Sequence, residues 1–306
     1  MTTRSHEASA APRSRGFVAL GARVEAAALA PGLHIVATPI GNLGDVSLRA
    51  LATLAAADAI LAEDTRVTRK LLDRYEIAAP LIPYHEHNAA EMRPRALARL
   101  VAGEALALVS DAGTPLVSDP GYKLVAEATA AGVAVVSVPG PCAAIAALTV
   151  AALPTDRFFF EGFLPAKTAA RRERIAALRA VPATLVFYEA PGRLAETLAD
   201  LAAELGPRPA AVARELTKLH EETRRATLVE LAGRYRETGA PKGEIVVVVG
   251  PPEPTAKPDA AALDAMILEA LEGLSVKDAA AAVAAEAGLP RREVYARALR
   301  LAGSRP

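Results

Sequence analysis

Short apolar runs alternate along the first half of the chain with longer segments in which apolar residues recur every three or four positions. The short runs end in turn-forming residues, which is typical of buried strands, and the longer segments predict amphipathic helices. A proline in the run at 81–84 predicts an edge strand there. Strands alternating with helices indicate a mostly parallel sheet covered on both faces. The predicted buried strands lie at 33–37, 58–62, 105–109 and 133–138.

The pattern changes near residue 154, where a second α/β lobe with its own sheet is expected. Strand-like runs recur at 184–188, 210–214, 226–229 and 244–249, with helices between them. Prolines at 251, 252, 254 and 258 then predict a linker, followed by three short helices. The expected domains are a disordered extension over 1–30, α/β domains over 31–153 and 154–252, and a linker with a small helical module over 253–306.

Composition restricts the kind of protein only in part. The chain of 306 residues has 35 basic and 35 acidic residues, so its net charge gives no sign of nucleic-acid binding. Cys142 is the only cysteine, which excludes an intramolecular disulfide and fits a cytoplasmic protein. Charged residues interrupt the N-terminal 30 residues, which argues against a secretory signal. Since no stretch approaches roughly 20 apolar residues, we expect no membrane partner.

Gly- and Pro-rich loops follow three of the predicted strands, at 38–42, 110–121 and 139–141. Because ligands bind beyond the carboxyl ends of strands in such sheets, these loops predict one active-site cleft. None of them matches the glycine fingerprints of dinucleotide or P-loop sites. We therefore expect an enzyme that binds a compact ligand without phosphates. Rigid loops would contact this ligand through their backbone groups.

Several polar residues near these loops allow two interpretations. Asp111 is expected to meet a ligand, whereas Asp119 either caps the next helix or has a role in the site. Glu63 and Asp64 either serve the site or pair with Arg66. His85 and His87 could share a strand face, but no thiol lies nearby, so we expect polar lining of the cleft and no metal site.

The second lobe also carries charged candidates. Glu189, Arg214 and Lys218 stand at predicted strand ends and either pair with one another or face the cleft. The basic segment 167–174 is either a solvated helix face or a phosphate-binding surface.

The order of the motifs resembles the ribosomal RNA small-subunit methyltransferases, a bacterial family of the tetrapyrrole methylase-like superfamily. The resemblance covers roughly residues 33–250 and extends to the helical tail. The motifs that carry it are Thr38–Asp45, Ala62–Arg66, His85–Asn88, Ser110–Gly121, Pro139–Ala144, Phe160–Pro165, Phe187–Glu189 and Ala213–Lys218.

The resemblance implies S-adenosylmethionine as methyl donor, bound between two α/β lobes of the tetrapyrrole methylase type. It also implies a homodimer that 2′-O-methylates a cytidine ribose of 16S rRNA in the 30S subunit. Methylation of a tetrapyrrole ring, such as a corrin precursor, and a non-enzymatic RNA-binding assembly factor are the competing interpretations.

The motifs also imply which residues form the site. Donor contacts are expected at Asp111, Ala112, Gly113, Leu116, Cys142, Ala143, Glu189 and Ala211. We expect RNA contacts at Arg66, Lys167, Arg171, Arg172, Arg214 and Lys218. Because a ribose hydroxyl is a poor nucleophile, a proton acceptor should assist it, and the candidates are Glu63, Asp64 and His85.

Overall fold

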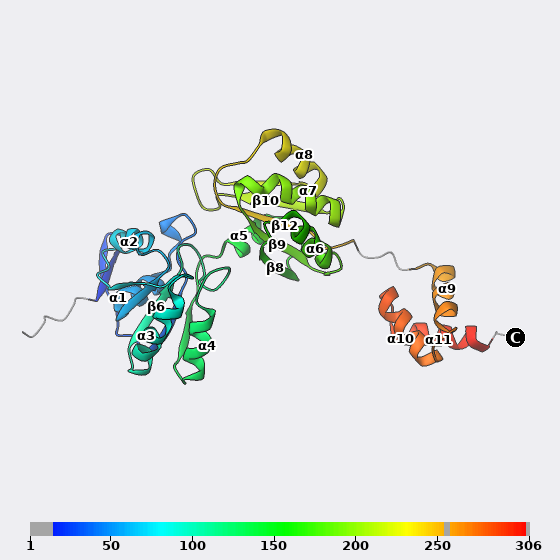
Figure 1. Cartoon of the computed structure of the whole chain (residues 1–306), viewed down its shortest axis with the longest axis horizontal. Helices are drawn as coiled ribbons and strands as arrows, with labels where there is room; N and C mark the ends of the chain where they lie inside the picture. The colour runs from blue at the N-terminus through cyan, green and yellow to red at the C-terminus, as the bar shows by residue number, and fades with distance from the viewer. Residues whose placement is uncertain (1–14, 254–257, 304–306) are drawn as a thin grey trace, which may run out of the picture. The chain divides into compact units, whose positions relative to one another are not determined.

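A computed structural model describes residues 15–253 and 258–303 (Figure 1). The chain divides into two compact units, residues 1–252 and 253–306. The second unit begins at Glu253, where the sequence analysis places the linker. The first unit holds two five-stranded sheets, each with its own helices, and a two-stranded hairpin.

The first sheet is parallel throughout and has the strand order β5-β4-β6-β3-β7. Alternate strand residues face opposite sides, so Ile60 packs on one face and Leu61 on the other. Leu54 and Leu72 from α1 and α2 cover the first face. Leu100 and Leu124 from α3 and α4 cover the second, which confirms the predicted parallel sheet with two covered faces. The elements are β3 (Gly32–Val36), η1 (Leu43–Asp45), α1 (Leu48–Ala56), β4 (Ala59–Ala62), α2 (Thr65–Arg74), β5 (Leu81–Pro83), α3 (Ala89–Val101), β6 (Ala105–Val109), α4 (Tyr122–Ala130) and β7 (Val135–Val138).

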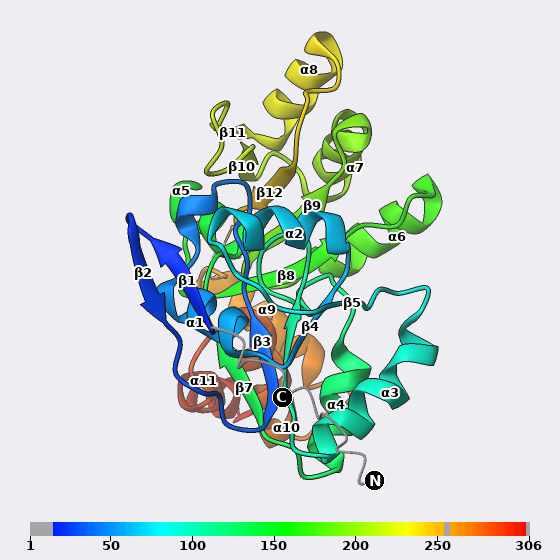
Figure 2. The same cartoon turned by 90° about the vertical axis from the view of Figure 1, so that its left-hand side faces the viewer.

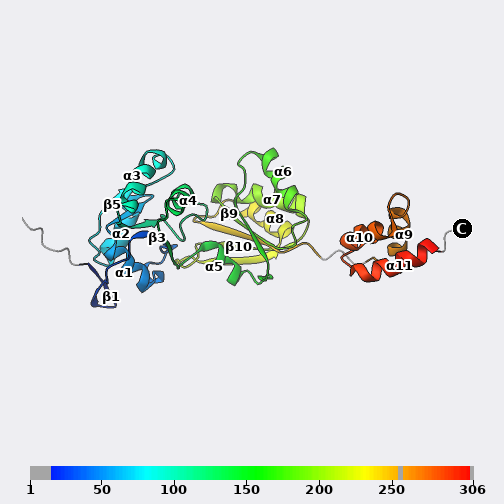
Figure 3. The same ribbon diagram turned by 90° about the horizontal axis from the view of Figure 1, so that it is seen from below.

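The second sheet is mixed and has the order β11-β10-β12-β9-β8, in which only β8 and β9 are a parallel pair. Helix α5 covers one face, with Leu148 against Val186 in a buried cluster. Helices α6, α7 and α8 cover the other face (Figure 3). The elements are α5 (Ala143–Val150), β8 (Phe158–Phe163), α6 (Thr168–Leu178), β9 (Thr184–Glu189), η2 (Pro191–Arg193), α7 (Leu194–Leu205), β10 (Pro209–Arg214), β11 (Glu222–Thr227), α8 (Leu228–Thr238) and β12 (Ile245–Val249).

Regular structure begins nearer the N-terminus than the sequence analysis predicts, at Gly16. Strands β1 (Gly16–Ala19) and β2 (Ala22–Glu25) form an antiparallel hairpin beside α1 (Figure 2). Phe17 is only 2% exposed because it packs into the core of the first lobe, and Val18 N donates to Tyr75 O at 2.8 Å. The predicted disorder is therefore wrong for residues 16–25. Residues 1–14, to which the same prediction applied, lie outside the described residues.

The predicted strand over 226–229 is also wrong in its bounds. Strand β11 ends at Thr227, and α8 begins at Leu228. Thr227 and Glu230 form a capping box, in which each side chain accepts from the backbone N–H of the other residue. This local signal starts the helix inside an apolar run that reads as a strand.

The second unit contains the three predicted helices, α9 (Ala260–Ala270), α10 (Val276–Ala287) and α11 (Arg291–Gly303). Ile267, Val283 and Val294 form its buried core. Across the described parts of both units, no helix combines the length and the apolar character that a bilayer crossing requires.

Candidate functional site

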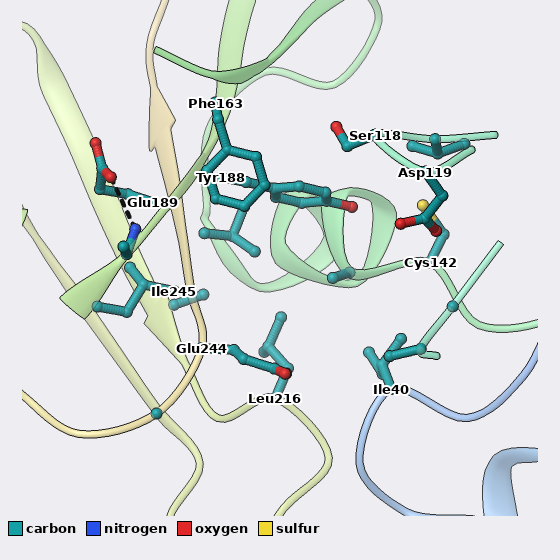
Figure 4. Close-up of a pocket in the computed structure, with 18 of the residues that line it drawn as sticks. Ile40, Ser118, Asp119, Cys142, Phe163, Tyr188, Glu189, Leu216, Glu244 and Ile245 are labelled. Carbon is teal, nitrogen blue, oxygen red and sulfur yellow. Dashed lines mark hydrogen bonds between the residues drawn. The ribbon is translucent and has the colours of Figure 1, made fainter. Parts of the chain in front are cut away.

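A cavity of about 360 Å³ lies where the loops of the first lobe meet the strand ends of the second (Figure 4). We call it the main cavity. The first lobe lines it with Ile40, Ala112, Gly113, Thr114, Val117, Ser118, Asp119, Cys142 and Ala143. The second lobe contributes Phe163, Tyr188, Glu189, Ala190, Pro191, Ala213, Leu216, Gly243, Glu244, Ile245 and Val246.

The loop after β6 is held against the loop after β3. Thr38 N donates to Gly113 O at 2.9 Å, and Gly113 N donates to Thr38 O at 3.1 Å. Thr38 Oγ1 also donates to Ser110 O at 3.1 Å. Gly113 has a φ of 88°, which a residue with a side chain rarely adopts, and a Cβ there would meet Ile40 Cγ2 at 3.2 Å. A glycine is therefore required at this wall of the cavity.

Four non-glycine residues beside the cavities have left-handed backbone angles. Leu116 and Ser118 have φ values of 73° and 66° in the loop after β6. Glu215 and Thr217 have values of 50° and 66° in the loop after β10. Such conformations cost energy and cluster at binding sites, so both loops have the character of preshaped ligand-binding segments.

Asp119 is a cavity residue that sequence reasoning left undecided. It points into the main cavity beside Tyr188 and Cys142 (Figure 4). It does not cap α4, because that helix begins at Tyr122 and Gly121 occupies the cap position. Burial raises the pKa of Asp119 to about 6, against the lowering effect of a hydrogen bond from Ser110. Burial likewise raises the pKa of Tyr188.

Glu189 reaches the same cavity but is already fully bonded. It is only 3% exposed, and its Oε1 accepts from Ala190 N at 2.7 Å, the dashed line of Figure 4. Its Oε2 accepts from Thr197 Oγ1 at 2.6 Å, and Arg193 Nε lies 3.4 Å from Oε1. The carboxylate therefore holds the Ala190–Pro191 edge in place rather than pointing free at a ligand.

The structure separates the residues expected to contact the donor into two groups. Ala112, Gly113, Cys142, Ala143 and Glu189 line the main cavity. The remaining three lie elsewhere. Asp111 lines a neighbouring cavity, Leu116 packs against the core of the first lobe, and Ala211 is fully buried beneath the sheet surface.

On β10, the residue that lines the main cavity is Ala213 rather than the predicted Ala211. Ala213 shares its side of the strand and lies nearer the strand's carboxyl end, so Ala213 lines the cavity instead.

A second cavity of about 210 Å³ adjoins the main one, since Ile40, Ala112 and Glu244 line both. Lys218 crosses its rim, and its Nζ donates to Glu215 Oε1 at 2.8 Å and to Glu244 Oε2 at 3.1 Å. The lining comprises Thr38, Pro39, Ile40, Gly41, Leu43, Val67, Thr68, Lys70, Leu71, Ser110, Asp111, Ala112, Lys218 and Glu244.

The three predicted proton acceptors, Glu63, Asp64 and His85, are not among the described residues that line either cavity. Asp64 caps α2 and pairs with Arg66 Nη2 at 2.6 Å, and these hydrogen bonds lower its pKa to about 2. A carboxylate held ionised in this way is a poor proton acceptor. Burial and the nearby Asp111 carboxylate raise the pKa of Glu63, so Glu63 is better suited than Asp64 to accept a proton.

His85 and His87, the two histidines considered as a metal-binding pair, contact each other. The rings of His85 and His87 pack edge to face with centroids 6.0 Å apart. In the part of the chain that the structure describes, no group of three or more His, Cys, Asp and Glu side chains is arranged to hold a metal ion.

The predicted RNA contact at Arg171 is wrong. Arg171 is 1% exposed, and its Nε donates to the buried Asp200 Oδ2 at 2.7 Å, so it cannot reach a phosphate. Arg172 is exposed, but it is bound to the other oxygen of Asp200 at 2.7 Å.

The other predicted cations are exposed to solvent to different degrees. Lys167 is exposed before α6, Arg66 is exposed on α2, and Arg214 is half-buried and donates to Lys242 O.

Comparison with known proteins agrees with this architecture. The model of the Tetrapyrrole (Corrin/Porphyrin) Methylases matches residues 32–232, and that of the RsmI C-terminal HTH domain matches residues 257–302. The chain is 52% identical to ribosomal RNA small subunit methyltransferase I of Mesorhizobium japonicum, over 91% of this chain and 95% of that protein. It is 51% identical to the protein of that name from Erythrobacter litoralis, over 89% of this chain and 96% of that protein.

The fold is shared with a solved structure of uroporphyrin-III C-methyl transferase from Thermus thermophilus complexed with S-adenyl homocysteine. The TM-score is 0.51 at 21% identity, covering 72% of this chain and 97% of that one. The family assignment rests on three findings. The chain has two lobes of this fold, their loops meet at the junction of the lobes, and a relative is 52% identical. The chain belongs to the ribosomal RNA small subunit methyltransferase I family of the tetrapyrrole methylases.

Proposed function

We propose that this protein transfers a methyl group from S-adenosylmethionine to the 2′-hydroxyl of a cytidine in 16S rRNA of the 30S subunit. The observation that carries the proposal is that the family's loops from both lobes converge on one cavity. The relatives with about half of their residues identical are named as methyltransferases of small-subunit ribosomal RNA.

The main cavity suits such a donor. Its wall is largely apolar, with Ile40, Val117 and Leu216, and the Asp119 carboxylate gives it a group that attracts positive charge. The donor supplies, when bound, a methyl group activated by a positively charged sulfur. Ala112, Gly113, Cys142 and Ala143 would hold it from the first lobe, and the edge that Glu189 fixes would hold it from the second. The contribution expected from the protein is orientation, which can supply about 7–11 kcal/mol.

We assign uptake of the hydroxyl proton to Asp111, which lines the second cavity, acting together with its neighbour Glu63, which lines neither cavity. Burial of Glu63 together with the charge of Asp111 raises the pKa of Glu63, which favours proton uptake by that carboxylate. Glu63→Gln should slow single-turnover methylation by at least about tenfold, since general-base catalysis contributes roughly 10²–10⁴-fold. Asp64→Asn should change that rate only slightly, because Asp64 is occupied with Arg66. Equal slowing by both variants would contradict the assignment.

The decisive experiment is mass spectrometry of 16S rRNA nucleosides after incubating unmethylated 30S subunits with the protein and the donor. We expect a new ribose-methylated cytidine. Methylation of a corrin precursor instead would identify a tetrapyrrole enzyme. An absence of donor binding in a calorimetric titration would favour an assembly factor without catalysis.

We further propose that the protein acts as a cytoplasmic homodimer. Phe158, Phe159 and Phe163 on edge strand β8 are 46%, 37% and 56% exposed, a concentration of apolar surface that a second copy could cover. Sedimentation should give twice the mass of one chain, and Phe158→Lys should shift the mass toward the monomer. A monomer at micromolar concentration would contradict this proposal.

A further inference from the structure

We propose that the second cavity and the exposed basic face of α2 together form the acceptor site. One nucleoside enters the cavity, and the adjoining RNA phosphates lie along Arg69 and Lys70. This inference rests on the proposed methyl transfer to RNA, and it adds to the expected contact at Arg66 two residues of α2, Arg69 and Lys70, that the sequence motifs do not assign.

The second cavity adjoins the main cavity. Methyl transfer needs the attacking oxygen within about 3–3.5 Å of the transferred carbon, so donor and acceptor must occupy volumes that open into each other. The two cavities share Ile40, Ala112 and Glu244. A hydroxyl held in the second cavity can therefore approach a methyl group held in the main one. The second cavity's volume of about 210 Å³ suits a single nucleoside rather than a length of chain.

The wall of the second cavity carries polar groups that can bind a ligand. Thr68 lines the cavity and is 4% exposed, and its Oγ1 has no hydrogen-bond partner among the described residues. Buried hydroxyls rarely lack a partner, and a ligand bound beside this one would supply it. Asp111 and Lys218 add an acceptor and a cation on the same wall. Ribose hydroxyls and base edges are the groups that such a wall can bind.

The surface beside the second cavity is basic. Helix α2 lines the cavity through Val67, Thr68, Lys70 and Leu71. The exposed positions of this helix also carry several cations and a single carboxylate; these positions are Arg66, Arg69, Lys70, Arg74 and Asp73. Within residues 15–253 and 258–303, no hydrogen bond or ion pair engages the side chain of Arg69 or Lys70.

Helix α6, the other basic helix, differs from α2 in this respect. Its Arg171 and Arg172 are bonded to Asp200, and its Arg174 is bonded to Glu161. Cations already matched by carboxylates gain little from a phosphate, whereas the unmatched pair on α2 is available to a polyanion. The charge pattern therefore favours α2 as the surface that holds the RNA backbone.

The first test compares two double variants that each remove two exposed charges from a helix. Arg69→Gln/Lys70→Gln changes α2, and Arg234→Gln/Arg236→Gln is the matched control on α8. The measurements are KM and kcat for 30S subunits at several salt concentrations, with donor affinity measured by calorimetry. We expect the α2 variant to raise KM roughly tenfold and to reduce the salt dependence of log KM by about 1.5 in slope, because two phosphate contacts are lost. Donor affinity and the control variant should stay as in the wild type.

The second test is Thr68→Val, which removes the hydroxyl while nearly keeping the shape of the side chain. Losing an unpaired buried hydroxyl should leave the melting temperature unchanged or higher. We expect kcat/KM for 30S subunits to fall at least about fivefold, with unchanged donor affinity.

The outcomes separate this inference from the proposed function. Wild-type methylation of 30S subunits with unchanged kinetics in both the α2 and the Thr68 variants would overturn the acceptor site while the proposed function stands. A wild-type protein that binds the donor but leaves 30S subunits unmethylated would overturn the proposed function itself.

Discussion

The carboxylate of Glu189 and the hydroxyl of Thr197 form a buried hydrogen bond of 2.6 Å that fixes one edge of the main cavity. The other carboxylate oxygen accepts from Ala190 N at 2.7 Å, so β9, the following loop and α7 are joined at one group. These bonds position Ala190 and Pro191, which line the cavity.

Thr197→Val should therefore weaken both the fold and the cavity. The variant leaves a buried carboxylate oxygen without its partner, which costs about 1–3 kcal/mol of unfolding free energy. We also expect a severalfold loss of donor affinity, because the Ala190–Pro191 edge is released. Urea unfolding and calorimetry measure the two effects. Thr238→Val, at an exposed hydroxyl of α8, is the control and should change neither.

Asp119→Asn should remove a pH-dependent cost to stability that the wild-type carboxylate carries. The folded pKa of about 6 lies above the ordinary value of 3.8, so the folded protein binds this proton more tightly than the unfolded chain does. The burial of the carboxylate therefore costs no stability below pH 3.8, and the cost grows until the group is ionised above about pH 6. The asparagine variant removes that charge, so it should melt higher than the wild type at about pH 8 and equally at about pH 4.

The donor gives an opposite expectation for the same variant. The neutral amide of the Asp119→Asn protein no longer attracts a cationic ligand, so donor affinity at about pH 8 should fall about tenfold even though the fold is more stable. Wild-type affinity should decline as the pH is lowered through about 6, whereas the variant should show no such decline. Parallel titration curves for the two proteins would show that Asp119 does not face the donor.

The first sheet and its order of elements could be predicted because short apolar runs identify buried strands with little help from the rest of the chain. In the second sheet, strand β8 was not predicted and β11 was predicted too late in the chain. The meeting of the loops after β3, β6 and β7 could also be predicted, since parallel strands present their carboxyl ends at one edge. The hairpin at 16–25 was missed because its one strong signal, Phe17, acts through a core formed much later in the sequence.

Individual site residues depend on partners that no local pattern reveals. Arg171 and Arg172 are adjacent and identical in type, yet only Arg171 turns inward, toward an aspartate that lies 29 positions later on α7. Asp119 enters the cavity because the loop after β6 winds through left-handed conformations at Leu116 and Ser118, which the sequence does not announce at non-glycine residues. Residue types predicted which charged and polar groups the site could contain. Tertiary packing determines which of these groups lack partners within the protein and can bind a ligand.

Arg171→Ala and Arg172→Ala should differ strongly in stability. Without Arg171, the carboxylate of Asp200, a residue only 2% exposed, keeps only the exposed Arg172 as a partner. Breaking such a buried ion pair costs about 3–5 kcal/mol of unfolding free energy. Removing Arg172, whose side chain is 56% exposed, should cost less than about 1 kcal/mol. Urea unfolding measures both. Arg171→Met/Asp200→Leu should recover part of the loss, and a pair of equally mild single variants would contradict the structural role of Arg171.

Gly41 and Lys218 should show a strong energetic coupling. A Cβ on Gly41 would overlap the side chain of Lys218, with Lys218 Cδ at 2.9 Å, so Gly41→Ala must displace the lysine from Glu215 and Glu244. Part of the cost comes from the glycine backbone angle and is independent of Lys218. A double-mutant cycle with Lys218→Ala separates the two parts, because truncating the lysine removes the overlap and leaves the backbone cost.

We expect Gly41→Ala to be less destabilising by about 1 kcal/mol or more when Lys218 is already alanine, within the range of roughly 0.5–3 kcal/mol for contacting pairs. Gly233→Ala, on α8 with no atom within 4 Å of the added Cβ, is the control and should show no coupling to Lys218. Additive free energies of unfolding for Gly41 and Lys218 would mean that the lysine does not lie over the glycine in solution. The second cavity would then lack the cation at its rim, and Lys218→Ala should leave the KM for 30S subunits unchanged.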